Sequence, residues 1–156
     1  MSTEATQVQL TQVQDFQFDV DFGVGPALRV DEPPPLGAGL GPTPLMLLGG
    51  AVANCLSASL LFAFRKFKQA PEPIRTEATL ETGRNAEGRL RVTGIRVTLH
   101  LGCKAASLGH LDRVLGSFES YCTVTQSVAS SIPVRVEVRD QEGLVLKPAD
   151  SSSLAP

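Results

Sequence analysis

Basic residues are missing from the start of the chain, where neither Lys nor Arg occurs before Arg29. A secretory signal opens with a basic segment followed by an apolar one, and this order is absent here. The 156 residues carry a formal net charge of only −2. So small a charge gives no electrostatic basis for binding nucleic acid or an anionic membrane surface. We therefore expect a cytoplasmic protein with no nucleic-acid partner.

Cysteine and histidine are scarce, with three and two residues. In a reducing cytoplasm, thiols such as Cys55, Cys103 and Cys122 stay free unless they take part in chemistry. His100 and Cys103 are three residues apart on a predicted strand and would point to opposite faces of it. We therefore expect no metal site, and no motif in the sequence predicts a cofactor.

Charge is absent between Leu45 and Phe64. Thr43 is a good helix cap, Pro44 suits the first helical position, and Pro71 follows the apolar run as a helix-ending residue. The pattern predicts one long helix that is apolar on every side. Such a helix must be surrounded by protein or by lipid.

A membrane span is the alternative interpretation of this helix. Its length and the basic residues Arg65, Lys66 and Lys68 after it fit the rules for a transmembrane segment. Small and polar residues interrupt the run, however, and no aromatic residue anchors its first end. We therefore predict a buried core helix and no membrane partner. The interrupting residues are Gly49, Gly50, Asn54, Ser57 and Ser59.

Alternation of apolar and polar residues predicts the strands around this helix. Two strands are expected within 7–22 and a short one at 27–30, followed by a Pro- and Gly-rich connector at 31–42. After the helix, a hairpin is expected from strands at 74–82 and 90–101, and later strands at 134–138 and 144–146.

A second helix is predicted to begin at Ser107. Leu108, Leu111, Leu115 and Phe118 follow at helical spacing, and Cys122 extends the same apolar stripe. The predicted fold class is therefore α+β, with antiparallel sheets, a long buried central helix and a second helix. We expect one domain over residues 1–148 and a disordered tail over 149–156.

One layer of half-buried strands cannot surround a helix that is apolar on all sides. A second copy of the chain can, so we predict a homodimer in which the central helices pack on each other. A stripe of small residues on the helix has the spacing for such close packing. It consists of Gly50, Ala53, Asn54 and Ser57.

Two sequence pieces resemble the OsmC/Ohr family of thiol-dependent hydroperoxide reductases. Gly41-Pro42-Thr43-Pro44 leads through an aliphatic helix to Ala53-Asn54-Cys55. The later piece, 120–125, contains Cys122 and is followed by the strand at Val134. The resemblance covers roughly residues 31–138.

This resemblance implies an intertwined homodimer with active sites at the subunit interface. It implies that Cys55 attacks the O–O bond of an organic hydroperoxide to give a sulfenic acid. Cys122 would then condense with it to form a disulfide, which a dithiol reductant would reduce.

The sequence departs from the family pattern at two positions. The family has a glutamate directly after the motif proline, where this chain has Leu45, and an arginine in the early strands, where Arg29 is the first arginine. Two functions therefore stay open. One is a two-cysteine peroxidase; the other is a non-catalytic dimer that binds an apolar small molecule. For the second, Leu45, Met46 and Phe62 are candidates to line the pocket. Arg29 is a further candidate for substrate binding, if it reaches the site from the early strands.

Overall fold

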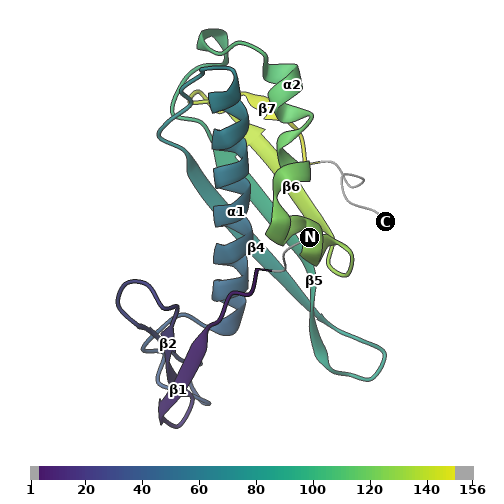
Figure 1. Cartoon of the computed structure of the whole chain (residues 1–156). Helices are drawn as coiled ribbons and strands as arrows, with labels where there is room; N and C mark the ends of the chain where they lie inside the picture. Colours follow the sequence, from purple (N-terminus) through teal and green to yellow (C-terminus); the bar gives the residue numbers. More distant parts are fainter. Residues whose placement is uncertain (1–3, 150–156) are drawn as a thin grey trace. The chain divides into compact units, whose positions relative to one another are not determined.

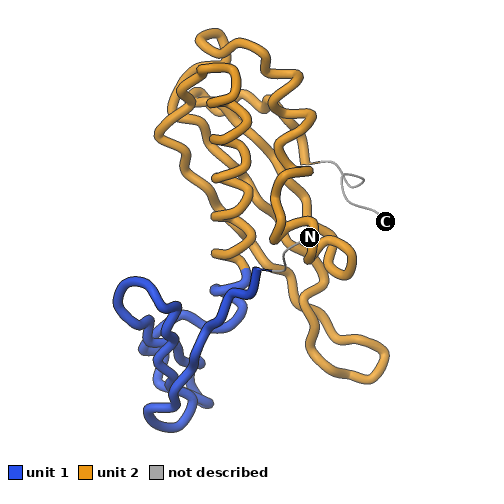
Figure 2. The backbone as a smooth tube through the Cα atoms, in the orientation of Figure 1, with its two compact units in different colours: residues 1–48 blue, residues 49–156 orange. Residues whose placement is uncertain are grey.

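The computed structural model describes residues 4–149 of the chain. The chain divides between Leu48 and Gly49 into two compact units, which Figure 2 distinguishes by colour. The tail predicted to be disordered lies outside the described residues, apart from Ala149. Whether the two units act as the one expected domain stays a prediction.

The first unit contains a small antiparallel sheet. Its strands are β1 (Gln9–Gln14), β2 (Gln17–Asp21) and β3 (Leu28–Val30), in that order across the sheet. These are the three strands that the alternating pattern predicts. β1 and β2 meet at the turn residue Asp15, which has a positive φ of 45°.

The connector after β3 is organised by Asp31. This buried carboxylate accepts hydrogen bonds from the backbone amides of Glu32, Ala38 and Leu40. Burial alone would raise the pKa of Asp31, but these bonds lower it below its usual value. Only glycine fits at position 37, because an added Cβ would lie 2.2 Å from the carbonyl oxygen of Glu32.

The second unit is built on a four-stranded sheet in the order β4-β5-β6-β7. Its strands are β4 (Arg75–Arg84), β5 (Leu90–His100), β6 (Val134–Arg139) and β7 (Val145–Lys147). β4 and β5 form the predicted hairpin. The prediction of purely antiparallel sheets is wrong for β5 and β6, which are parallel. The helical crossover between them returns the chain to the end where β5 began, as a parallel pair requires.

One face of this sheet forms the core. Apolar residues alternate with polar ones on β5 and β6, and the parallel register places the apolar ones side by side. The helices cover this face, as Figure 1 shows. The other face carries Arg96, Thr98 and His100 on β5 and Arg135, Glu137 and Arg139 on β6. The buried residues are Ile95, Val97, Leu99, Val134, Val136 and Val138.

The long helix α1 (Pro44–Lys66) packs on this sheet through one of its sides. An added Cβ on Gly49 would lie 2.6 Å from Leu80 Cδ1, so the helix and β4 touch closely there. Ser57 Oγ and Thr76 Oγ1 are 2.6 Å apart across the same contact. Leu56 and Leu60 are fully buried on this side. Burying a leucine side chain stabilises a fold by about 1.5–3 kcal/mol.

The other side of α1 is exposed in the single chain, so the predicted burial on all sides is not reached within it. A sheet on one side can cover only one side of a helix. By length and composition alone, α1 also fits a membrane span, but its close contacts with β4 are those of a core helix. The exposed residues recur at every fourth position: Met46, Gly50, Asn54, Ala58 and Phe62.

The predicted single helix from Ser107 to Cys122 is wrong. Residues 105–129 form four short pieces: η1 (Ala105–Ser107), α2 (Leu111–Leu115), η2 (Phe118–Tyr121) and α3 (Thr123–Ala129). Ser107 lies inside η1, and His110, with a φ of 60°, precedes α2. Ser117 Oγ donates to the carbonyl of Arg113, a local bond that competes with regular helix. The apolar spacing identified a helical segment but not its interruptions.

Asp140 provides a test of this fold. Its buried carboxylate accepts the backbone amides of Ala105, Glu142 and Leu144, and the bond from Ala105 is the main cause of its lowered pKa. We expect Asp140→Asn to lower the thermal midpoint at pH 7, because the amide NH₂ cannot accept a hydrogen bond. A carboxylate whose pKa is lower in the folded than in the unfolded protein stabilises the fold at any pH above its unfolded-state pKa. This stabilisation is lost as the pH falls through the pKa of the folded protein. The difference between variant and wild type should therefore shrink in acid. A constant difference in midpoint from pH 7 to pH 3, followed by circular dichroism, would contradict this role.

Candidate functional site

Cys55 lies near the middle of α1, at the border between its buried and exposed sides. Val52 and Leu56 next to it are fully buried, whereas Asn54 is exposed. The thiol is free and half-buried. Part of the side chain is therefore accessible to a small molecule, while the helix backbone fixes its position.

Cys122 lies between η2 and α3 and is completely buried. Its amide donates to the carbonyl of Glu119, and its carbonyl accepts from the amide of Gln126. The thiol donates to Thr125 Oγ1 at 2.9 Å, and Thr125 is buried as well. The backbone of Cys122 is thus held by two hydrogen bonds and its thiol by one to Thr125, and the thiol is closed to solvent.

The structure brings Cys55 and Cys122 together. Burial raises the pKa of the Cys122 thiol, and its hydrogen bonding and electrostatic interaction with Cys55 raise it further. The bond to Thr125 works in the opposite direction. Both sulfurs belong to the second unit, so the two residues that the sequence singled out share one site.

This arrangement gives the two thiols different properties. The accessible Cys55 can meet a substrate, whereas the buried Cys122 is held as a protonated thiol beside it. Since a thiolate is the nucleophile in thiol chemistry, Cys55 is the better candidate for first attack. Cys122 is placed to react with whatever forms on Cys55.

The other candidate residues lie elsewhere or are exposed. Leu45 and Met46 belong to the exposed part of α1 in the first unit. Arg29, also in the first unit, forms an ion pair with Asp19, which raises the pKa of the guanidinium. Phe62 is exposed on α1, and its ring makes an edge-on contact with Tyr121 at 6.5 Å. A substrate-binding role for these residues stays a prediction.

Sequence reasoning missed two partners of the Cys122 segment. Thr125 is one, and its position three residues after Cys122 at the start of a helix was the available signal. The other is Lys147, whose ammonium lies 2.9 Å from Glu119 Oε1, with both side chains mostly buried. Lys147 comes from β7, so no local sequence pattern reveals this ion pair. It ties the Cys122 segment to the sheet and offsets the carboxylate charge three residues from Cys122.

Cys103 is separate from the pair. It is free and half-buried, and its carbonyl accepts the amide of Gln141. Within residues 4–149, no cluster of three or more His, Cys, Asp or Glu side chains could hold a metal ion.

Comparison with known families gives one match, to the family described as OsmC-like protein, over residues 37–137. This covers more than half of the chain and includes both cysteines. No curated protein sequence matches the chain.

Solved structures with the same fold are numerous. An OsmC-like protein of unknown function from Vibrio cholerae has a TM-score of 0.74 at 17% identity, with 87% of this chain and 99% of that chain covered. An organic hydroperoxide resistance protein of the same organism, with captopril bound in one of its active sites and described as putative, gives 0.68 at 22% identity, covering 93% and 96%. The organic hydroperoxide resistance protein OhrB of Bacillus subtilis gives 0.67 at 14% identity, covering 87% and 98%.

The raised pKa of Cys122 predicts its pattern of alkylation. At pH 7 we expect iodoacetamide to label Cys55 and Cys103 well before Cys122, because Cys122 is both buried and protonated. Its labelling should increase only at a pH above the value of about 8.5 for a free thiol. Peptide mass spectrometry after timed alkylation measures this. In urea, Cys122 should react like the other two cysteines; preferential labelling of Cys122 in the folded protein at pH 7 would contradict the geometry.

Proposed function

The chain belongs to the OsmC-like protein family, and from this premise we propose that it is a two-cysteine peroxidase that reduces organic hydroperoxides. The observation that carries the proposal is the meeting of Cys55 and Cys122 in one site, with Cys55 accessible and Cys122 buried. Two neighbouring thiols can form and release a disulfide, which a lone cysteine cannot do. No metal or organic cofactor is part of the proposal.

The proposed cycle has three steps. Cys55, as a thiolate, attacks the outer oxygen of the hydroperoxide; the O–O bond breaks, the alcohol leaves after taking a proton, and Cys55 becomes a sulfenic acid. The Cys122 thiol then attacks the Cys55 sulfur, which forms the disulfide and releases water. A dithiol reductant finally returns both residues to thiols and is itself oxidised to a disulfide.

The surroundings of the pair favour an apolar substrate. α1 carries no charged residue between Leu45 and Phe64, so a peroxide that reaches Cys55 meets uncharged and mostly apolar helix side chains. The relatives named as organic hydroperoxide resistance proteins agree with this class of substrate. At sequence identities this low, the similarity shows a shared fold alone. The two neighbouring thiols are therefore the support for a peroxidase.

A second candidate function has its own supporting observation. Leu45 occupies the position of the glutamate in the family pattern, and Arg29 is already paired with Asp19. Without that carboxylate and its arginine, the site lacks the groups that the family uses to hold a thiolate. The alternative is a non-catalytic OsmC-like protein that binds an apolar small molecule between subunits, with Leu45, Met46 and Phe62 lining the pocket.

Both candidates use a homodimer. The exposed side of α1 is apolar or small from Met46 to Phe62. Apart from the helix itself, no atom of residues 4–149 lies within 4 Å of a Cβ added to Gly50. A glycine inside a helix lowers the stability of the helix by about 1 kcal/mol relative to alanine. Close packing of a second α1 against Gly50 would explain why a glycine occupies this position. An interface of this kind would close the exposed side of the site around Cys55. Intertwining of the two chains, implied by the resemblance, belongs to the same proposal.

Thiol counting separates the two functions. One equivalent of cumene hydroperoxide should rapidly remove two free thiols from the wild type, as measured by alkylation and intact mass. Cys103→Ser is the matched control and should lose the same two, because Cys103 lies outside the pair. Cys55→Ser should lose none.

Two outcomes of this experiment would contradict the proposal. If the wild type keeps all its thiols under conditions that oxidise a hydroperoxide resistance protein of the family, the peroxidase proposal fails and the binding function stands. If Cys55→Ser loses as many thiols as the wild type, the attacking residue is misassigned.

The homodimer is tested by Gly50→Arg. The single chain has room for the new side chain, so the variant should fold, but a charged side chain on the helix–helix interface should convert dimer into monomer. Light scattering coupled to size exclusion measures the mass. Ser127→Arg, at an exposed position of α3, is the control and should stay dimeric. A wild type with the mass of one chain would end the dimer proposal.

A further inference from the structure

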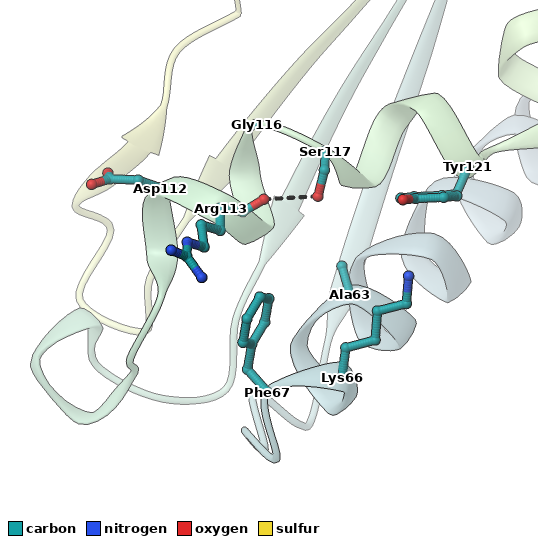
Figure 3. A pocket seen from close by; sticks show the side chains of 8 residues that line it. All are labelled: Ala63, Lys66, Phe67, Asp112, Arg113, Gly116, Ser117 and Tyr121. Atoms are coloured by element: carbon teal, nitrogen blue, oxygen red, sulfur yellow. Dashed lines mark hydrogen bonds between the residues drawn. The ribbon is translucent and has the colours of Figure 1, made fainter.

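A cleft that neither Cys55 nor Cys122 lines lies between the end of α1 and α2, and we call it the α1–α2 cleft. Its volume is about 480 Å³, within the range of small-molecule sites. Ala63, Lys66 and Phe67 line it from α1 and the residue after it, and Asp112, Arg113 and Tyr121 line it from the helical segment opposite. Figure 3 shows these side chains around the opening.

Lys66 is held in place at one side of the α1–α2 cleft by two aromatic rings. Its ammonium lies 4.8 Å from the ring centroid of Phe62 and 4.6 Å from that of Tyr121. Both distances are within the range of cation–π attraction. Among residues 4–149, Lys66 has no carboxylate within ion-pair distance. The ammonium is therefore positioned but keeps its hydrogen-bond donors available.

Arg113 provides a second positive charge. It is exposed on α2, and no carboxylate among the described residues pairs with it. Its carbonyl accepts a hydrogen bond from Ser117 Oγ at 2.7 Å. In Figure 3 Arg113 and Lys66 lie on opposite sides of Phe67, and the carboxylate of Asp112 points away from Lys66. The cleft therefore presents two positively charged side chains, while the carboxylate of Asp112 is directed away from Lys66.

The rest of the cleft is lined largely by apolar groups, among them Ala63, Phe67 and Tyr121. Phe67 stacks on His110 with the ring centroids 4.6 Å apart and an angle of 24° between the planes. An aromatic ligand can cover Phe67, whereas a free inorganic anion would leave it uncovered.

We propose that the α1–α2 cleft binds aromatic carboxylates. The guanidinium of Arg113 donates paired hydrogen bonds to the carboxylate, a geometry for which its planar fork is suited. Lys66 adds a further electrostatic attraction, and the aromatic ring of the ligand lies against Phe67. This binding uses neither sulfur, so it stands or falls separately from the peroxidase proposal.

A pair of matched probes tests the proposal. 2-Naphthoate carries the charge, and 2-naphthamide has nearly the same shape without it. Titration calorimetry on the intact wild-type chain should show saturable binding of the carboxylate, at least about tenfold tighter than that of the amide, as expected for hydrogen bonds to charged groups. The Cys55→Ser variant should bind 2-naphthoate as the wild type does.

Charge-removing variants locate the site. Arg113→Gln and Lys66→Met should each weaken 2-naphthoate binding by about tenfold or more. Arg84→Gln, an exposed arginine on the β4–β5 turn, is the control and should leave binding unchanged. Equal affinities for the two probes, no saturable binding of 2-naphthoate, or an equal loss in Arg84→Gln would each overturn the proposal. Displacement of 2-naphthoate by inorganic phosphate at similar concentration would do the same.

Discussion

The packing of α1 on the four-stranded sheet is the contact on which the rest of the second unit depends. Gly49 lets the helix approach Leu80 of β4 without a side chain between them. Further along the helix, the hydroxyl of Ser57 meets that of Thr76, which also belongs to β4. These contacts fix the rotation of the helix about its own axis. Cys55 is consequently placed at the border of the buried side, close to Cys122 and still partly open to solvent.

The segment that carries Cys122 is fixed by different forces. Phe118, Cys122 and Thr125 are buried in the core, and the ion pair between Glu119 and Lys147 ties the segment to β7. Regular helix is nevertheless interrupted in this segment, since α2 ends at Leu115 and α3 begins only after Cys122.

The pattern of apolar residues was sufficient to predict α1, the β4–β5 hairpin and the strands of the first unit, because each reflects a local periodicity. The same reasoning predicted one helix after Ser107, and this failed because periodicity does not register Gly116 or the bond from Ser117 to Arg113. The parallel pairing of β5 and β6 was missed for a related reason, since strand direction depends on the length of the crossover. The pairing of Cys55 with Cys122 came from the family resemblance, and the structure supports it. Lys147 could not be found, because its contact with Glu119 joins distant parts of the chain.

In the proposed cycle, peroxide first oxidises the sulfur of Cys55, and the thiol of Cys122 then attacks the resulting sulfenic acid to form the disulfide. The most direct measurement traps the intermediate. In Cys122→Ser, treated with cumene hydroperoxide in the presence of dimedone, the sulfenic acid cannot be resolved and should be captured as a dimedone adduct on Cys55, identified by peptide mass spectrometry. An adduct on Cys103 instead, or none at all while a related peroxidase is labelled under the same conditions, would contradict the account.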